Sequence, residues 1–441
     1  MRIIIILILI YKRSTNLGSS SYQEKGRKMA KREIISIIGG SMAGLFAAIS
    51  LRAQGFIVNL YERSSSSLES RGAGIATHGE LKNIAKFIGK EFAGESGIIS
   101  TERQLLNLSG AATHKREIKQ TMSSWGLIYR FLRKFIREEE YHPNHKFLDV
   151  QKKNSKTLVI RFENGKELET NWLIGADGMN STVRGCVDPI SKPTYANYLA
   201  WRGLVKESDI EPEVLDALSN KMTFGIAPKG HWLGYLVAGP KDSLSVGNRY
   251  YNWIWYRGES QTSLIRHLIG SDKKYYPNGI PHDLIKPAII GKMHDDARAS
   301  LAPQLNHLIQ KTPNPFLQGI YDFKSSRMTF GRVVLIGDAA FTARPHVGLG
   351  VYKAAEDAIT LAQAMGCSGP GQMESLKYWE KQRVRFGNAA FSWGQDLGSY
   401  ISSDMDELSQ SNRAKFFKRP EVLITQNASN NPEKYLINYY E

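Results

Sequence analysis

Cysteine is scarce in this chain, since only Cys186 and Cys367 occur among its 441 residues. Two cysteines so far apart match neither a disulfide scaffold nor the paired spacing of a zinc site. The ten histidines are scattered as well, so we predict no metal site. This cysteine usage fits a reducing compartment, and we therefore expect a cytoplasmic protein.

Long hydrophobic runs are also lacking. The apolar run Ile3–Ile10 is far shorter than the ~20 residues that a membrane-spanning helix needs. No clear small-x-small cleavage site follows it, and residues 11–28 are polar and Ser-rich without periodicity. We expect residues 1–28 to be a disordered extension or to precede the true start, with the working protein beginning near Met29. A weak membrane tether through Ile3–Ile10 is the alternative, and we expect no other membrane contact.

Acidic residues are outnumbered by basic ones. The chain has 42 Asp and Glu against 58 Lys and Arg, a net charge of +16, and its first 33 residues hold eight of the basic and two of the acidic side chains. A basic surface can bind nucleic acid, but the basic–aromatic repeats of a nucleic-acid module are lacking, so we predict no such partner. Such a surface would also attract an anionic nicotinamide cofactor.

The most informative segment of the sequence runs from Val333 to Ala358. The apolar run 333–336 predicts a buried parallel strand, and Asp338 follows at its tip. A Gly-broken loop then leads into a predicted helix with an apolar face. A carboxylate at a strand tip can bind a ribose or ribitol hydroxyl, and a helix start can bind an anionic ring. A flavin has both parts, so this segment favours a flavin site.

A Gly-rich turn lies near the start of the chain, between a predicted strand at 34–38 and a predicted helix. Its residues are Gly39, Gly40, Ser41, Met42, Ala43 and Gly44. A dinucleotide-binding turn has Gly at the first, third and sixth places, and here the third is Ser41, whose hydroxyl can donate to a phosphate. Glu62 ends the next predicted strand at the spacing that lets an acid bind a ribose. An ordinary strand-to-helix turn is the alternative.

A third motif follows the apolar strand that ends near Gly175. Asp177 and Gly178 stand at the tip, and Arg184 comes a short helical turn later. We expect Arg184 either to neutralise Asp177 or to reach a phosphate. A structural strand end capped by Asp177 is the alternative.

The remaining pattern completes the predicted organisation. Residues 158–173 predict a hairpin around Asn164-Gly165, and residues 191–290 alternate and are rich in Trp and Tyr. We predict an α/β fold with a Rossmann-like domain from residues 29–190 and 291–370 and an inserted, mostly antiparallel β substrate domain at 191–290. A C-terminal helical segment and tail occupy 371–441, and we expect little order in about the last thirty residues.

Together, the three motifs resemble the FAD-dependent aromatic hydroxylases, the group A flavoprotein monooxygenases, over about residues 34–364. The resemblance implies a p-hydroxybenzoate hydroxylase type of FAD domain, with the Gly-rich turn, Glu62 and Arg63 on the ADP half of FAD. It places Asp177 and Gly178 by the pyrophosphate and Asp338 on the ribitol. The family's helix start at the flavin ring corresponds to Gly348, Leu349, Gly350, Val351 and Tyr352. By the same resemblance, NADH or NADPH would reduce FAD, and O2 would give a flavin C4a-hydroperoxide that hydroxylates an electron-rich aromatic or heteroaromatic small molecule.

Finer details resemble the dihydroxypyridine hydroxylase branch of this family. They are the Gly-Gly-Ser turn and the segments 61–64, 198–203 and 344–346. His346 is the predicted catalytic base, because the resemblance places it beside the flavin; a loop histidine bonded to backbone is the alternative. Further candidates to line the substrate pocket are His231, Tyr235, Arg202 and Tyr250.

The chain departs from the family pattern at three places. Phe341 replaces a common His, Tyr352 replaces a common Asn, and Trp125-x-x-Ile128 replaces an Arg-x-x-Leu element that touches FAD. A helix is predicted around residues 125–137, and Trp125 and Arg130 are its candidate contacts to FAD. We also predict that Leu148, in a short strand, lies under the adenine.

A second Gly-rich fingerprint is not found, which argues against two-dinucleotide reductases and Baeyer–Villiger enzymes. Two other functions stay open: oxidation or reduction of an alicyclic or isoprenoid substrate by FAD, and flavin binding without turnover. A homodimer is the assembly that we consider.

Overall fold

The computed structural model describes residues 33–66, 68, 74–92, 96–277, 279–367, 371–402 and 410–440. Residues 1–28 lie outside these residues, and so do both the expected extension and its alternative, a membrane tether through Ile3–Ile10. Within them, no helix has the length and apolar character needed to cross a membrane, and no group of three potential metal ligands comes together.

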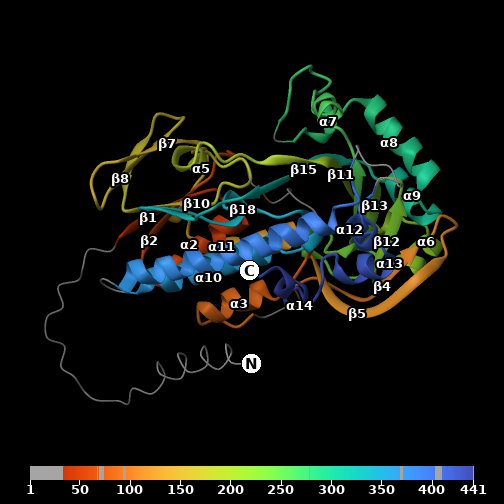
Figure 1. Cartoon of the computed structure of the whole chain (residues 1–441), viewed down its shortest axis with the longest axis horizontal. Coiled ribbons are helices and arrows are strands. Elements are labelled where there is room, and N and C mark those ends of the chain that lie inside the picture. The colour runs from red at the N-terminus through yellow and green to blue at the C-terminus, as the bar shows by residue number, and fades with distance from the viewer. Residues whose placement is uncertain are drawn as a thin grey trace, which may run out of the picture. The chain divides into compact units, whose positions relative to one another are not determined.

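A six-stranded sheet forms the core of the Rossmann-like part (Figure 1). Its order is β16 (Thr329–Phe330), β17 (Val333–Leu335), β10 (Trp172–Gly175), β1 (Ile34–Ile38), β2 (Ile57–Tyr61) and β6 (Tyr141–His142). All neighbouring strands are parallel except β16 and β17. The predicted strands at 34–38 and 333–336, and the predicted strand that leads to Glu62, are thereby confirmed. Their carboxyl ends meet at one edge of the sheet.

Two helices of the Rossmann-like part pack closely against each other. They are α2 (Met42–Ala53) and α10 (Gly350–Gly366). Most apolar residues of α2, among them Leu45 and Leu51, are fully buried. Both helices begin at the edge where β1 and β17 end, which is the place where an open α/β sheet binds its ligand.

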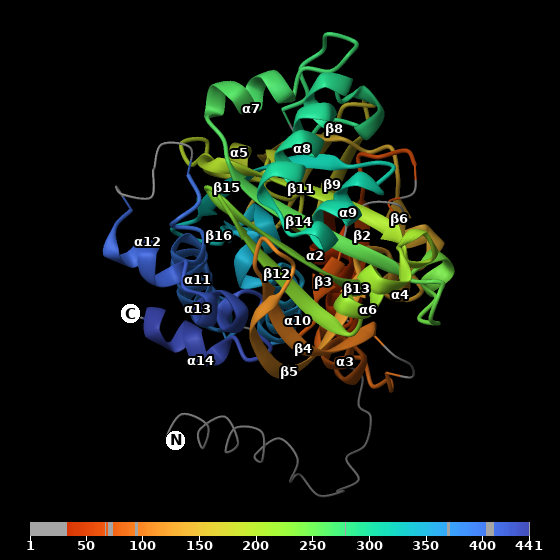
Figure 2. The ribbon, with the colours of Figure 1, turned by 90° about the vertical axis from the view of Figure 1, so that its right-hand side faces the viewer.

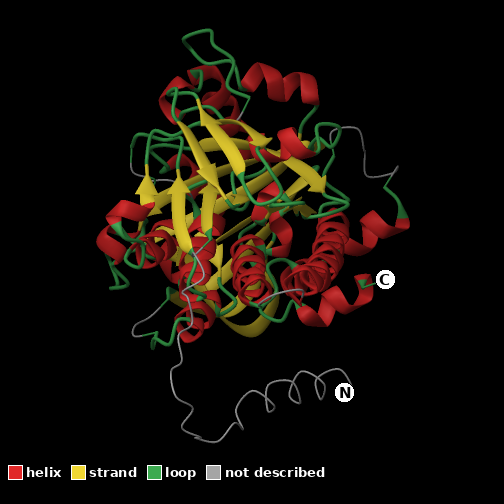
Figure 3. Ribbon diagram, turned by 90° about the vertical axis from the view of Figure 1, so that its left-hand side faces the viewer, coloured by secondary structure: helices red, strands yellow, loops and turns green. Residues whose placement is uncertain are grey.

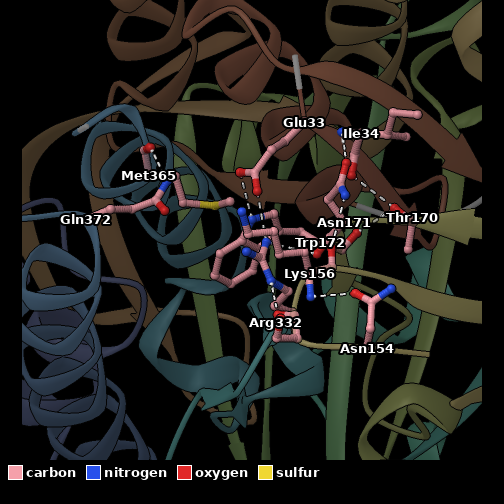
Figure 4. A network of polar contacts seen from close by, with 11 residues as sticks. Glu33, Ile34, Asn154, Lys156, Thr170, Asn171, Trp172, Arg332, Met365 and Gln372 are labelled. Carbon is pink, nitrogen blue, oxygen red and sulfur yellow. Dashed lines mark hydrogen bonds and ion pairs between the residues drawn. The ribbon is translucent and has the colours of Figure 1, made fainter. Parts of the chain in front are cut away.

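Figure 4 shows the opposite edge of this sheet, where side chains join the starts of three strands. Trp172 Nε1 donates to Glu33 Oε2 at 3.1 Å, and Arg332 Nη1 donates to Glu33 Oε1 at 2.9 Å. These contacts tie β1, β10 and β17 together at the end remote from their carboxyl edge.

A nine-stranded, mostly antiparallel sheet forms the second layer (Figure 2). Its order is β18 (Phe341–Thr342), β15 (Phe316–Lys324), β11 (Thr194–Lys206), β14 (Tyr250–Gly258), β13 (Gly230–Val237), β12 (Lys221–Ala227), β4 (Ile98–Leu106), β5 (Ala112–Ser124) and β3 (Gly74–Ala76). The sheet therefore draws strands from both sides of the predicted 191–290 segment, and the domain boundaries at 190 and 290 stay a prediction.

The third sheet contains the predicted hairpin. It consists of β7 (Phe147–Lys152), β8 (Leu158–Phe162) and β9 (Glu167–Thr170). The turn at Asn164-Gly165 is confirmed, but β9 ends at Thr170, and the next residues belong to β10 of the parallel sheet. The hairpin predicted for residues 158–173 thus merged two strands of different sheets in its second arm.

The other helices cover the sheets at the periphery (Figure 3). They are α3 (Glu80–Phe87), α4 (Trp125–Arg133), α5 (Thr182–Val187), α6 (Pro212–Leu218), α7 (Gln261–His267), α8 (Pro287–Ser300), α9 (Pro303–Gln310), α11 (Gly371–Leu397), α12 (Asn412–Phe417), α13 (Pro420–Gln426) and α14 (Glu433–Leu436).

The expected lack of order in the last thirty residues is wrong. Helices α12, α13 and α14 fill this region, and Ala414, Leu423 and Leu436 in them are fully buried. These helices are too short to show a clear periodicity, and their burial comes from packing against α11 and the larger sheet.

Candidate active site

Close backbone packing shapes the turn between β1 and α2. Gly39 has a φ of +112°, which favours glycine. A Cβ on Gly44 would stand 1.8 Å from the Gly39 carbonyl oxygen, and one on Gly40 would stand 2.5 Å from Tyr141 Oη. Ser41, whose side chain makes no capping hydrogen bond, precedes α2. The turn therefore leaves the first N–H groups of α2 without side-chain partners, as an anion-binding helix start does.

Glu62 is held beside this turn by two backbone donors. Gly40 N–H donates to Oε2 and Ser64 N–H donates to Oε1, each at 2.8 Å. The side chain is buried at the end of β2 and still borders a cavity. Each carboxylate oxygen keeps a further lone pair that can accept from a ligand hydroxyl.

The third motif is connected to the loop after β17. Asp177 accepts from Ser181 Oγ at 2.5 Å and from Val183 N–H at 3.1 Å, and burial raises its pKa against the effect of these bonds. Arg184 donates to the carbonyl oxygens of Ala339 at 2.9 Å and Met179 at 2.5 Å. Its guanidinium thus donates to backbone carbonyl groups and not to a carboxylate. Of the two predicted roles, a charge interaction with Asp177 is present, because burial lowers the pKa of Arg184 and the charge of Asp177 raises it, and the phosphate contact stays a prediction.

Asp338 stands directly beyond β17, in the 3-10 turn Gly337–Ala339. The Gly337 N–H donates to Asp357 Oδ2 of α10 at 3.0 Å, which fixes this turn against the helix. The Asp338 side chain lines two adjoining cavities, and Gly350 and Val351 at the start of α10 line both as well. One continuous site therefore passes between the strand-tip acid and the helix start.

The first cavity, of about 390 Å³, brings most of the predicted cofactor residues together. The predicted residues that line it are Gly39, Ser41, Met42, Ala43, Glu62, Arg63, Trp125, Asp177, Gly178, Asp338, Gly350 and Val351. Gly40 and Gly44 shape the turn behind them, while Gly348 and Leu349 line the second cavity. Lys146 and Phe147 also line the first cavity, and no motif in the sequence pointed to them.

Three predicted cofactor contacts lie elsewhere. Arg130 forms an ion pair with Asp242. The Leu148 side chain is 46% exposed, while its neighbour Phe147 borders the cavity. Tyr352 lines a separate depression, where its ring meets His78 edge-on.

The second cavity, of about 270 Å³, is small and largely apolar. Its aliphatic walls include Met222, Leu233 and Ile254, and its polar groups include Arg202, Tyr235, Tyr256 and His346. The Nε atom of Arg202 is buried and has no hydrogen-bond partner among the described residues. A buried guanidinium nitrogen without a partner favours an anionic or carbonyl oxygen as ligand.

His346 is 1% exposed, at the edge of this cavity. Its Nε2 and Tyr198 Oη are 2.8 Å apart, and its ring centroid is 4.3 Å from that of Tyr256. Burial holds the pKa of His346 well below its usual value, and the nearby charges of Arg344 and Arg202 lower it further. The imidazole is therefore neutral at pH 7, with Nδ1 buried and unbonded within the described chain.

The other two pocket candidates do not line this cavity. His231 is fully buried, its Nδ1 lies 2.7 Å from Tyr400 Oη, and burial lowers its pKa to about 3. Its ring centroid is 5.2 Å from that of His346, so His231 supports the cavity wall from behind. Tyr250 begins β14 and pairs with Lys206 and Val237, away from the cavity lining.

The residues present fit an FAD molecule. Close glycines and the free start of α2 suit a pyrophosphate, Glu62 suits a ribose, and Asp338 suits a ribitol hydroxyl. The start of α10 lines both cavities and suits a ring that becomes anionic when reduced. The site then continues past this helix start into the second cavity.

Comparison with known proteins agrees with this geometry. The family described as "FAD binding domain-like" matches residues 195–322, and the one described as "FAD binding domain" matches residues 317–393. The 2,6-dihydroxypyridine 3-monooxygenase of Paenarthrobacter nicotinovorans is 32% identical over 369 residues, which is 83% of this chain and 91% of that protein. The 6-hydroxynicotinate 3-monooxygenase of Pseudomonas fluorescens is 25% identical over 76% of this chain and 83% of its own.

Solved structures agree as well. The 2,6-dihydroxypyridine-3-hydroxylase from Arthrobacter nicotinovorans superposes with a TM-score of 0.79 at 28% identity, covering 87% of this chain and 96% of that chain. HpxO of Klebsiella pneumoniae, solved with FAD and uric acid, has the same fold, with a TM-score of 0.70 at 18% identity over 92% of this chain and 97% of that chain. The chain belongs to the FAD-dependent aromatic hydroxylases, a family of NAD(P)H- and O2-using flavoprotein monooxygenases.

Proposed function

We propose that this monooxygenase hydroxylates a small hydroxylated pyridine or a similar electron-rich heteroaromatic ring. The observation that carries the proposal is the buried, unpartnered Nε of Arg202 in a cavity of about 270 Å³ beside the start of α10. The names of two relatives, which describe monooxygenases of dihydroxypyridine and hydroxynicotinate, support the same ring class.

In this proposal, Arg202 binds a deprotonated ring oxygen of the substrate. A charge-assisted hydrogen bond to a guanidinium contributes about 1.5–3 kcal/mol. The negative charge also makes the ring more nucleophilic, because the oxygen donates electron density into it. Arg202 therefore both orients the ring and favours its reactive form.

His346 takes the proton that the ring hydroxyl loses. It is neutral at pH 7 because burial lowers its pKa, and Nδ1 is the ring atom that the described residues leave unbonded. With the single imidazole proton on Nε2, donated to Tyr198 Oη, the Nδ1 lone pair is available as the base.

The apolar walls hold the ring and exclude water. Tyr235 and Tyr256 present aromatic surface, and Met222, Leu233 and Ile254 complete the lining. FAD, when bound, supplies the transfer of electrons from NAD(P)H and the activation of O2. Glu62, the turn at 39–44 and Asp338 would hold it, with the start of α10 at its ring.

The test is a substrate screen with the FAD-loaded protein, in which NAD(P)H oxidation and ring products are measured together. Hydroxypyridines should accelerate NAD(P)H oxidation and yield a hydroxylated ring, whereas alicyclic compounds of similar size should do neither. Product from an alicyclic compound alone would contradict the proposed substrate class. The preference between NADH and NADPH emerges from the same screen, while a homodimer and a cytoplasmic location stay predictions.

A further inference from the structure

A fully buried arginine lies outside both cavities, in β4. Arg103 is 1% exposed, and no ion pair joins it to a carboxylate in the described part of the chain. Burial lowers its pKa to about 10, so the guanidinium is charged at neutral pH. A buried charge of this kind is costly unless polar groups surround it. Its partners therefore reveal what it holds in place.

Those partners are three backbone carbonyl groups at the end of α13 and the side chain of Gln120, whose Oε1 accepts from Arg103 Nη2 at 2.5 Å. Arg103 Nη1 donates to the carbonyl oxygens of Asn427 at 2.6 Å and Ile424 at 3.2 Å, and Nη2 donates to that of Ala428 at 2.6 Å. Gln120 Nε2 donates to the same Ala428 oxygen at 3.0 Å. A cation stabilises the carbonyl end of a helix. The bond from Arg103 to the Ala428 carbonyl oxygen also holds Ala428 at a φ of +44°, which a residue other than glycine rarely adopts.

The turn made by Asn427 and Ala428 contacts the loop that carries the proposed base. Ala428 N–H donates to the His346 carbonyl oxygen at 2.6 Å. A Cβ on Gly348 would lie 2.8 Å from Ala428 Cα, so the two backbones are in close contact. Ala428 itself lines the second cavity. The C-terminal segment therefore forms a wall of the active site in addition to its peripheral helices α12, α13 and α14.

The Asn427 side chain adds an interaction with the His346 ring. Burial lowers the pKa of His346, whereas the Asn427 side chain raises it. Its Oδ1 and His346 Nδ1 are both buried, and neither has a hydrogen-bond partner within the described residues. An acceptor beside an unbonded Nδ1 stabilises the protonated ring, in which Nδ1 becomes a donor.

We propose that Arg103 is a positioning residue that acts through the 427–428 turn, and that Asn427 Oδ1 accepts the Nδ1–H bond when His346 is protonated. The turn thus fixes the His346 backbone through Ala428 and the protonated ring through Asn427. This inference rests on the proposed function for the proton step, but its geometry is independent of the substrate.

The first test changes the acceptor and measures the histidine directly. Asn427→Asp retains the shape and places a carboxylate next to the His346 ring, so the pKa of His346 should rise by about 1–3, as for a histidine that gains a carboxylate partner. The measurement is an imidazole NMR titration of the full-length, FAD-loaded protein without substrate, with His346→Gln to assign the signal. An unchanged pKa would overturn the role of Asn427, even if the proposed substrate class holds.

The second test replaces the Arg103 guanidinium, which holds the 427–428 turn by its hydrogen bonds. Arg103→Lys keeps the charge but cannot reach three carbonyl groups in the same plane. We expect kcat to fall about tenfold, which corresponds to about 1.4 kcal/mol, with KM changed less than twofold and more NAD(P)H oxidised per product. Arg249→Lys, at a buried arginine that pairs with Glu207, is the matched control and should lower stability with kcat unchanged. If Arg103→Lys resembles this control, Arg103 is only structural.

If the wild type hydroxylates none of the rings while the NMR result holds, the proposed function fails and the turn's contact with His346 stands.

Discussion

Gly40→Ala tests whether the turn before α2 and Glu62 form one cofactor-binding unit. The new Cβ would stand 2.5 Å from Tyr141 Oη and 2.8 Å from Glu62 Cβ, so both side chains must move. Overpacking of this kind costs about 1–3 kcal/mol of folding free energy. Displacing Glu62 also strains its 2.8 Å bonds from Gly40 and Ser64, and losing one such bond to a carboxylate costs about 1.5–3 kcal/mol.

We therefore expect Gly40→Ala to lower the free energy of unfolding by about 1–3 kcal/mol and to raise the Kd for FAD at least about tenfold. Urea unfolding and titration of the apoprotein by flavin fluorescence measure the two effects. Gly185→Ala is the matched control, because Gly185 is exposed in α5 and no atom lies within 4 Å of its new Cβ. If Gly40→Ala binds FAD as the control does, Glu62 and the turn are not a unit.

Three further predictions follow from the site. Asp338→Asn should weaken FAD binding about tenfold or more, since a hydrogen bond to a carboxylate contributes about 1.5–3 kcal/mol; an unchanged fluorescence titration contradicts this. Arg202→Met should raise KM for a hydroxypyridine about tenfold or more and leave slow, substrate-free NAD(P)H oxidation unchanged; equal effects on both rates would remove Arg202 from substrate binding. Burial lowers the pKa of His346 and His231, so the unfolded chain binds protons below pH 6.5 that the native protein does not. Each histidine should therefore cost about 1.4 kcal/mol of stability per pH unit as the pH falls from 6.5, and His231→Gln should make urea-unfolding stability less dependent on pH; an unchanged slope refutes this.

The local motifs were predictable because each one places a strand, a turn and a helix next to each other in sequence. The strand tips at Gly175 and Leu335 and the start of α2 come together once the parallel sheet forms, without any long-range information. The acids Glu62 and Asp338 follow from their positions at strand ends.

The three misplaced cofactor contacts have simple geometric causes. Tyr352 lies two residues after Gly350, and two steps of a helix turn its side chain to the far side of α10. Leu148 is one residue beyond Phe147, so strand alternation directs it outward. Arg130 lies one residue past Tyr129, which stacks on Trp125, and it pairs with Asp242 from a distant loop.

The C-terminal wall of the active site depends on contacts that no local pattern encodes. Arg103 and Ala428 are 325 residues apart in sequence. Their contact depends on how α13 packs against β4, and the 410–440 segment is polar enough to resemble a tail. The antiparallel pair β4 and β5 was also missed. The middle of β5 carries three consecutive charged residues, Lys115, Arg116 and Glu117, which break the apolar–polar alternation typical of a strand.

Incorporation of labelled oxygen decides whether this protein hydroxylates a ring with an oxygen atom from O2. The FAD-loaded protein is supplied with NAD(P)H, ¹⁸O2 and the hydroxypyridine that most accelerates NAD(P)H oxidation, and the ring product is analysed by mass spectrometry. We expect one ¹⁸O atom in each new ring hydroxyl. In Arg202→Met at low substrate concentration, we expect neither the hydroxylated product nor its label. Hydrogen peroxide without a ring product, or a ring hydroxyl that carries oxygen from water, would contradict the expected ring hydroxylation by O2.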